Sequence, residues 1–180
     1  MQCDSLNTHN VFLMGADKAK AEESWGALRF NDPDAPCFQD NEFPFNFYVH
    51  RASAVDSTAA PEGCDSIMVL VPCCTLKRDT SLSKLPRDES IKGYERQFGE
   101  AFISRVRDVV FCRLGKLDGL EDLKEHIIDE IVDTPATYAD YYNLAAGTPF
   151  ALVSSNHHLL RFDCLQYLRM IIVNQPTNSQ

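Results

Sequence analysis

Basic residues and long apolar runs are both scarce in this sequence of 180 residues. Its 17 Lys and Arg are outnumbered by 26 Asp and Glu, which gives a formal charge of -9 and leaves no basic stripe for a phosphate backbone to contact. No apolar run approaches the roughly 20 residues that a membrane-spanning helix needs. The N-terminal segment 1–10 carries no Lys or Arg, so it shows neither a secretory nor a transit signal. We therefore expect no nucleic-acid partner and no transmembrane segment, and the localisation stays unknown.

The spacing of glycine and cysteine excludes two further kinds of site. The 8 glycines include no G-x-G, whereas a dinucleotide fold needs closely spaced glycines so that backbone N–H groups can approach the pyrophosphate. The 7 cysteines are odd in number and include no C-x-x-C pair, which fits neither a disulfide framework nor a thiolate zinc site. We expect the chain to hold no dinucleotide by itself and its cysteines to be reduced packing residues.

The first half of the sequence has the apolar periodicity of strands and a helix. Residues 11–15 are apolar and end in glycine, which predicts a strand, and Asp17 is placed to cap a helix that follows. Apolar and polar side chains alternate over 45–50, which predicts a half-buried strand. Residues 67–72 are apolar throughout, which predicts a central strand covered on both faces. Two strands in tandem indicate a sheet.

The second half is dominated by one long periodic segment. Over 86–114 apolar residues recur three or four positions apart, which predicts an amphipathic helix about 43 Å long. Gly93 and Gly99 each cost such a helix about 1 kcal/mol relative to alanine, so a break is expected near either one. Residues 126–132 fit a strand as well as a helix, and Thr134 is placed to cap a further short helix. The sequence thus predicts an α+β fold with a mixed sheet and one long amphipathic helix.

No arrangement of titratable residues indicates an active site. Adjacent residues on a strand point to opposite faces, so neither the adjacent histidines nor the adjacent carboxylates are expected to act together on one ligand. The histidine on the polar face of its strand is expected at a surface or a tunnel mouth, and the paired cysteines are expected to pack at a strand end. We therefore predict no catalytic residue, no cofactor-binding residue and no metal site. The residues considered are His50, Cys73, Cys74, Asp129, Glu130, His157 and His158.

One stretch of the sequence carries a specific resemblance. It contains FYV at 47–49, a loop of the pattern S-x-x-D-x-x-x-A-P-E-G at 53–63, and a strand that ends in V-L-V-P at 69–72. This order resembles the bacterial and fungal type of phytoene desaturase, the FAD-dependent carotenoid desaturases of the amine-oxidase-like superfamily. The matching residues are Phe47, Tyr48, Val49, Ser53, Asp56, Ala60, Pro61, Glu62, Gly63, Val69, Leu70, Val71 and Pro72.

Two more segments support the same resemblance. Residues 134–152 are similar to the family's T-P-x-x-(Y/F)-x-x-x-(Y/F)-N-x-x-x-G-x-x-F-x-L stretch, and residues 6–13 are similar to a segment that precedes the first block in the family. Residues 153–180 match only loosely. The resemblance therefore implies a partial substrate-binding domain over 1–152, followed by a divergent C-terminal tail.

The resemblance implies the substrate domain of a flavoprotein without its dinucleotide-binding part. Carotenoid desaturases hold a long C40 polyene in an apolar tunnel and abstract a hydride from it with FAD, while the protein positions the substrate and excludes water. FAD is expected in the full-length family and not on this chain alone, because the flavin motifs are absent from its sequence. The implied partners are the apolar polyene and, for a full-length protein, a membrane surface contacted peripherally. The implied substrate-binding residues are Phe47, Tyr48, Tyr142 and Phe150, with core packing as the alternative role.

Other interpretations of the sequence stay open at this point. Within the same superfamily the alternatives are a carotene isomerase and a retinoid saturase, and from a different class the alternative is a non-catalytic lipid-binding module. If the flavin-binding parts lie outside the chain, the apolar surface that packs against them is uncovered, and each exposed Val, Ile or Phe forfeits about 1.5–3 kcal/mol. We therefore expect the isolated chain to be poorly soluble and inactive as a desaturase.

Overall fold

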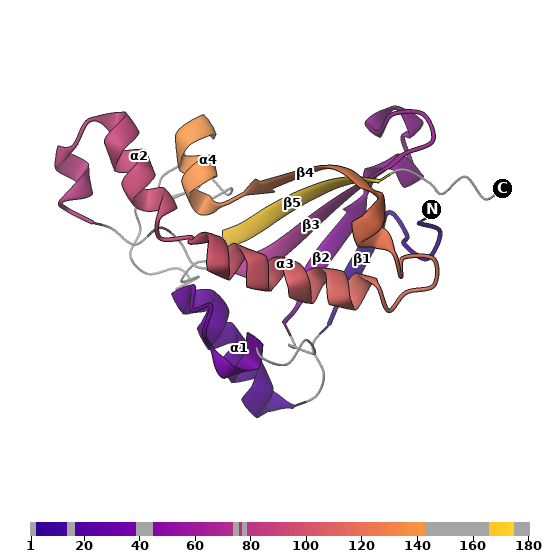
Figure 1. The fold of residues 1–180 in the computed structure, drawn as a ribbon, viewed down its shortest axis with the longest axis horizontal. Coiled ribbons are helices and arrows are strands. Elements are labelled where there is room, and N and C mark those ends of the chain that lie inside the picture. The colour runs from indigo at the N-terminus through magenta and orange to yellow at the C-terminus, as the bar shows by residue number, and fades with distance from the viewer. Residues whose placement is uncertain are drawn as a thin grey trace, which may run out of the picture.

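The computed structural model describes residues 3–13, 17–38, 45–73, 76, 79–142 and 166–174. These residues form α-helices and one β-sheet (Figure 1). The elements in chain order are β1 (His9–Phe12), α1 (Lys18–Phe30), η1 (Pro36–Phe38), β2 (Phe47–Arg51), η2 (Ala52–Ala54), η3 (Ser57–Ala59), β3 (Asp65–Cys73), η4 (Leu82–Lys84), α2 (Arg87–Glu95), α3 (Glu100–Leu114), η5 (Leu123–His126), β4 (Ile127–Asp133), α4 (Pro135–Tyr142) and β5 (Gln166–Asn174), where η marks a short 3-10 helix.

The described strands form a 5-stranded sheet in the order β1-β2-β3-β5-β4. The architecture is α+β, as predicted. The predicted mixed sheet is wrong, because every pairing among the described strands is antiparallel. β1, β2 and β3 follow one another as neighbours with the chain reversing each time, and β5 then runs antiparallel to both β3 and β4. A parallel pair would instead require a crossover connection across the sheet.

One face of the sheet is packed into the core. In β3 the odd-numbered residues are buried and the even-numbered ones are half-buried, and β2 begins with the same alternation. α3 lies in front of the sheet in Figure 1 and places Phe102 and Val106 in the same hydrophobic core as the buried strand residues. The prediction that residues 67–72 are covered on both faces is therefore wrong. Helix packing covers the odd-numbered side chains, and the even-numbered ones stay partly exposed.

The segment predicted as one helix over 86–114 forms two helices. Gly99 is the N-cap of α3 and has an extended conformation, so the single long helix is interrupted there. The sequence marked Gly99 as one of two places for a break, and that expectation is confirmed. The turn lets Phe98, 4% exposed, join the core. Gly93 has a different role, because a Cβ at this position in α2 would clash with the Leu82 side chain.

β5 comes from the part of the sequence that was predicted to be a divergent tail. Its backbone pairs with β3 over 65–73 and with β4 on its other side. Residues 166–174 of the predicted tail are thus part of the sheet, and the boundary at 152 stays a prediction. The same pairing decides the conformation of 126–132, which periodicity left open. Residues 127–133 form a strand because β5 offers their backbone groups a row of partners.

An ion pair connects α3 to β4. Arg107 Nε lies 2.7 Å from Glu130 Oε1, and Arg107 Nη2 lies 2.7 Å from Glu130 Oε2, so the contact is bidentate. The hydrogen bonds to Glu130 raise the pKa of Arg107. The guanidinium carbon also lies 4.6 Å from the centroid of the Phe111 ring. Glu130 thus faces the helix, while the register places its neighbour Asp129 on the opposite side of the strand, as predicted for adjacent strand residues.

Truncation of Phe102 tests the packing of α3 on the sheet. Phe102 is 1% exposed and meets Phe38 edge to face with ring centroids 6.1 Å apart, so the change to alanine leaves a cavity. Phe102→Ala is expected to lower the free energy of unfolding by about 3–5 kcal/mol. The measurement is the urea midpoint from pulse proteolysis of the chain fused to a soluble carrier protein.

An exposed aromatic residue provides the control for this substitution. Tyr141 is 77% exposed, so Tyr141→Ala is expected to change the free energy of unfolding by no more than about 0.5 kcal/mol. Equal losses in the two variants would contradict the packing described here.

Candidate functional site

Side chains on the second face of the sheet stay partly exposed. Residues opposite each other in neighbouring strands share a face. The register therefore aligns two rows of side chains across β1, β2 and β3, and both rows continue across β5 to β4. Val11 is 64% and Ile131 is 50% exposed, whereas the aligned residues of β2 and β3 are half-buried. We use the name open face for His9, Val11, Tyr48, His50, Met68, Leu70 and Ile131.

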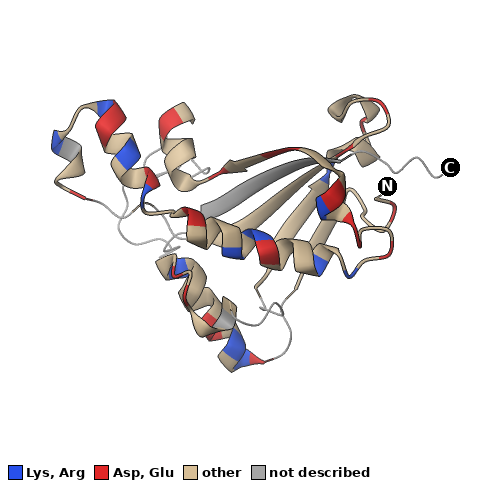
Figure 2. Ribbon diagram, viewed as in Figure 1, with Lys and Arg blue, Asp and Glu red and all other residues tan. Residues whose placement is uncertain are grey.

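The strands that carry most of the open face contain few charges. Figure 2 shows Lys, Arg, Asp and Glu mainly on the helices and connections, and little colour along β1, β2 and β3. The charged residues of these three strands are Arg51 at the end of β2 and Asp65 at the start of β3. They alternate with the open-face residues of their strands and pair with each other on the packed side. The row that contains Tyr48 and Leu70 continues in the register to Arg169 of β5 and Asp133 of β4.

The residues predicted to bind substrate are placed differently from one another. Tyr48 lies on the open face and is half-buried. Phe47 points to the packed face, is 2% exposed, and stacks on Phe12 with ring centroids 4.5 Å apart. Tyr142 lies on α4 and is 57% exposed, and Phe150 lies outside the described residues. Phe47 therefore packs in the core, whereas Tyr48 is the one predicted substrate-binding residue that lies on the open face.

Tyr48 belongs to a cluster with two histidines. His9 Nδ1 contacts the Tyr48 hydroxyl and also lies 3.3 Å from His50 Nδ1. The two imidazole centroids are 4.9 Å apart, and their planes are inclined by 36°. His50 is thus at the surface of its strand, which agrees with its predicted place on the polar face. No group of three or more His, Cys, Asp or Glu within the described ranges is arranged to hold a metal ion.

A nearly buried ion pair joins β2 to β3 beside the S-x-x-D sequence. Arg51 Nε donates to Asp65 Oδ1 at 2.9 Å, and the two side chains are 14% and 10% exposed. Ser53, the first residue of S-x-x-D, donates its hydroxyl to the same Oδ1 at 2.6 Å and accepts a bond from the Ser66 N–H at 3.1 Å. Burial raises the pKa of the Asp65 carboxyl. The hydrogen bonds from Ser53, Arg51 and an N-terminal backbone N–H, together with the Arg51 charge, lower the pKa by more than burial raises it. The pKa of Asp65 therefore lies below its ordinary value.

The acidic residue of S-x-x-D has a local structural role. Asp56 accepts hydrogen bonds from the Thr58 N–H at 2.9 Å and the Thr58 hydroxyl at 2.6 Å, which caps η3 and lowers the pKa of Asp56. A hollow of about 390 Å³ lies beside this loop. S-x-x-D therefore shapes the connection between β2 and β3. The hollow is lined by Ser53, Ser57, Pro61, Glu62, Gly63, Cys64 and Asp65.

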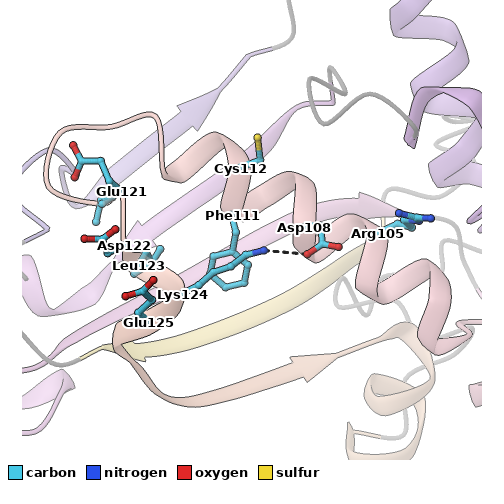
Figure 3. Close-up of a pocket in the computed structure, with 10 residues that line it drawn as sticks. Arg105, Asp108, Phe111, Cys112, Glu121, Asp122, Leu123, Lys124 and Glu125 are labelled. Atoms are coloured by element: carbon cyan, nitrogen blue, oxygen red, sulfur yellow. Dashed lines mark hydrogen bonds and ion pairs between the residues drawn. The ribbon is translucent and has the colours of Figure 1, made fainter.

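A second hollow, of about 550 Å³, lies between α3 and η5 (Figure 3). Charged side chains dominate its lining, and Lys124 Nζ lies 3.1 Å from Asp108 Oδ1. Covering such charges with hydrocarbon costs several kcal/mol, so this hollow does not suit an apolar ligand. Its lining residues are Arg105, Asp108, Phe111, Cys112, Leu120, Glu121, Asp122, Leu123, Lys124 and Glu125.

The described residues do not fit the diphosphate of a dinucleotide cofactor. In dinucleotide folds the pyrophosphate is bound by the N–H groups at the start of the helix that follows the first strand. Here the Asp17 carboxylate occupies that position, because it accepts bonds from the Ala19 N–H at 3.0 Å and the Lys20 N–H at 3.2 Å. This confirms the predicted cap of α1. A phosphate would be repelled there, and the sequence has no G-x-G to bring another backbone segment close to one.

Two expectations about cysteines and membranes can be compared with the structure. Cys73 is 1% exposed and packs at the end of β3, as predicted, whereas Cys74 lies outside the described residues. Cys3, Cys64, Cys73 and Cys112 are not in disulfides. Among the helices of the described ranges, none combines the length and the apolar character needed to cross a membrane.

Sequence reasoning missed most of the open face and the ion pair beside it. Periodicity predicts Met68 and Leu70 inside a core covered on both faces, because both are as apolar as the buried residues next to them. The alternation of polar residues in β2, taken together with a pairing to β3, is the signal that could have placed them. Arg51 and Asp65 are 14 residues apart, and their contact depends on that same pairing.

Comparison with curated proteins places the sequence beside carotenoid desaturases. It is 26% identical over 150 residues to the 4,4'-diapophytoene desaturase (4,4'-diaponeurosporene-forming) of Staphylococcus aureus strain MRSA252. This alignment covers 83% of this chain and 25% of that protein. It is 35% identical over 162 residues to the phytoene desaturase of Fusarium fujikuroi. This alignment covers 87% of this chain and 26% of that protein. The chain is therefore phytoene desaturase-like over most of its sequence.

The extent of these matches limits what they show. The chain spans about a quarter of the length of the curated relatives it matches. No protein-family profile and no solved structure matches it. Both relatives are oxidoreductases by name, and the resemblance inferred from residues 47–76 and 134–152 is confirmed.

The lowered pKa of Asp65 predicts a loss of stability in acid. Because the pKa is lower in the folded state than the unfolded value of about 3.9, the carboxylate stabilises the fold above about pH 4. This contribution is lost as the pH falls through the folded-state pKa. Asp65→Asn removes the charge that pairs with Arg51, so we expect it to cost about 3 kcal/mol at neutral pH and to lose less stability in acid than the wild type.

Urea midpoints from hydrogen exchange of β2 and β3 peptides in the carrier fusion measure both effects. Glu62→Gln, at an exposed position in the same loop, is the control and is expected to follow the wild type. If Asp65→Asn and the wild type lost equal stability between about pH 7 and about pH 3, the role assigned to this carboxylate would be refuted.

Proposed function

We propose that this chain forms the substrate-facing part of a carotenoid desaturase, with the open face as one wall of the site that holds a long apolar polyene. The observation that carries the proposal is the open face, whose named residues include no Lys, Arg, Asp or Glu and stay partly exposed on a sheet whose other face is packed. Apolar surface of this kind gains about 25 cal/mol per Å² when an apolar partner covers it. The similarity to enzymes named for phytoene and diapophytoene supports a polyene as that partner.

The side chains of the open face suit such a substrate. A polyene hydrocarbon has no group for hydrogen bonding or proton transfer, so its site requires shape and the exclusion of water. Tyr48 presents an aromatic ring, Met68 a flexible thioether and Leu70 a branched side chain, all of them half-buried. The charged hollow beside α3 has the opposite character, which supports the open face as the substrate surface.

The redox chemistry of such an enzyme comes from FAD, which in this proposal is bound by residues outside this chain. The carboxylate cap at the start of α1 and the lack of G-x-G support that division. The task of this chain is then to hold the polyene in place and to keep water away from it. The proposal treats the fold as a substrate domain of the amine-oxidase-like kind, in an enzyme that takes its apolar substrate from a membrane surface.

A chimera tests the proposed function. Residues 6–174 replace the matching segment of the Fusarium fujikuroi phytoene desaturase, and phytoene desaturation is measured in bacteria that make phytoene. We expect the chimera to desaturate phytoene and Met68→Asp to lower its rate at least about tenfold, because a carboxylate against hydrocarbon costs several kcal/mol. Met68 is used because its register partner in β5 is the apolar Ile171.

Val55→Asp is the matched control in the chimera. Val55 is 73% exposed and lies in the β2–β3 connection, away from the open face, so its replacement is expected to leave the rate within about twofold. A chimera that binds FAD but leaves phytoene unchanged, or equal rates for Met68→Asp and Val55→Asp, would contradict the proposal.

Flavin binding by the isolated chain tests the placement of FAD. The carrier fusion is purified, incubated with FAD and desalted, and its absorption spectrum is recorded. We expect no retained flavin from the fusion and stoichiometric flavin from the chimera. Stoichiometric FAD on the carrier fusion would overturn the assignment of the flavin to residues outside this chain.

A further inference from the structure

Two histidines face each other across the β1–β2 ladder at one end of the open face. His9 and His50 are direct register partners, so their side chains leave the sheet on the same side. Their Nδ1 atoms are 3.3 Å apart, and their ring planes are inclined by 36°. The third titratable group of this corner is Tyr48 on β2, whose hydroxyl contacts His9 Nδ1. His9 is exposed and His50 is half-buried, so the pair can exchange protons with the solvent.

The neutral pair suits an apolar surface, whereas the protonated pair does not. A neutral imidazole carries one N–H and one lone pair, so one Nδ1 can donate while the other accepts. Protonation of both rings puts an N–H on each Nδ1, and two donors then oppose each other between positively charged rings whose centroids are 4.9 Å apart. An apolar ligand that covers these rings removes their charges from water, which is unfavourable. Charge on the pair therefore opposes the binding of hydrocarbon beside it.

The charges that share the sheet with this pair lie on its packed side or several strands away. Within β1, β2 and β3, whose residues are all described, the charged residues are Arg51 and Asp65, which pair on the packed side. The register places Arg169 of β5, and Asp129 and Asp133 of β4, on the face of the pair but two or three strands from β2, about 10–14 Å away. These distances exceed the Debye length of about 8 Å at physiological ionic strength. The charge at this corner is therefore set by the two imidazoles.

We propose that His9 and His50 make the open face a pH-dependent binding surface, which takes an apolar polyene when both imidazoles are neutral and releases it when they are protonated. Imidazole is the side chain that ordinarily changes its charge between about pH 5 and 8. Protons and the polyene oppose each other's binding at this corner, and the coupling is reciprocal. The inference rests on the proposed function, because it assigns a regulation to the same polyene surface.

Binding of diphenylhexatriene tests this inference in the carrier fusion. The probe is a polyene hydrocarbon without a titratable group, and its fluorescence rises in apolar surroundings. We expect its Kd to increase at least about tenfold between about pH 8 and about pH 5.5, because the imidazoles become charged over this range. Both values lie above the range in which the Asp65 carboxylate loses its contribution to stability. Met68→Asp is expected to weaken binding at about pH 8, which locates the probe on the open face.

The 5 histidines of the sequence provide a matched pair of variants. The first variant combines His9→Gln with His50→Gln. Glutamine is neutral and still forms hydrogen bonds, so the Kd of this variant is expected to change by no more than about twofold over the same pH range. The second variant combines His126→Gln, His157→Gln and His158→Gln, and it is expected to keep the full pH dependence of the parent. The carrier alone gives the background.

Several outcomes would overturn the inference. They are no probe binding above the carrier at about pH 8, a Kd in the parent that does not change with pH, equal pH dependence in the parent and the first variant, and a second variant without pH dependence. If the first variant binds poorly at every pH, His9→Gln alone, at its exposed position, is expected to weaken the pH dependence, and an unchanged dependence would overturn the inference. Desaturation by the chimera is a separate measurement. A chimera that desaturates phytoene, beside probe binding that ignores pH, would overturn this inference and leave the proposed function standing.

Discussion

Burial of one face of the sheet together with α3 is the constraint on which the rest of the structure depends. The side chains of Phe47, Val49 and Val69 leave their strands on the side where Phe102 and Val106 complete the core. A strand has a side-chain period of two, so committing these residues to the core directs their neighbours to the other face. The open face is therefore a direct consequence of the packing.

Two ion pairs hold this frame together. The pair formed by Arg51 and Asp65 closes one end of the β2–β3 ladder, and the pair formed by Arg107 and Glu130 fixes α3 to the edge strand β4. Both pairs are hydrogen-bonded and partly or almost wholly shielded from water, so removing one partner leaves the other charge poorly solvated. Between the two pairs, the named residues of the open face include no Lys, Arg, Asp or Glu, and the register pairs Leu70 with Arg169 of β5.

Features set by neighbouring residues could be predicted from the sequence. Asp17 caps α1, the alternation over 45–50 overlaps β2 at 47–51, and the long periodic segment breaks at Gly99, because each depends on local hydrogen bonding or backbone preference. The insertion of β5 between β3 and β4 could not be predicted, because the apolar residues near the C-terminus lack a clean period and their partners are distant in sequence. The same long-range pairing decided the strand direction and the exposure of Met68. The candidate site was therefore only partly visible in the sequence, which named Tyr48 and no other residue of the open face as substrate-binding, and the role of Tyr48 stays a prediction.

The claim that the open face meets the polyene can be tested by crosslinking. A photoreactive benzoylphenylalanine is placed at position 68 of the chimera, on the open face, or at position 104 on the exposed side of α3, and each protein is irradiated with radiolabelled phytoene. Label is predicted on the protein with the probe at 68 and not on the one with the probe at 104. Equal labelling at the two positions, or none at 68 in a chimera that still desaturates phytoene, would contradict the account.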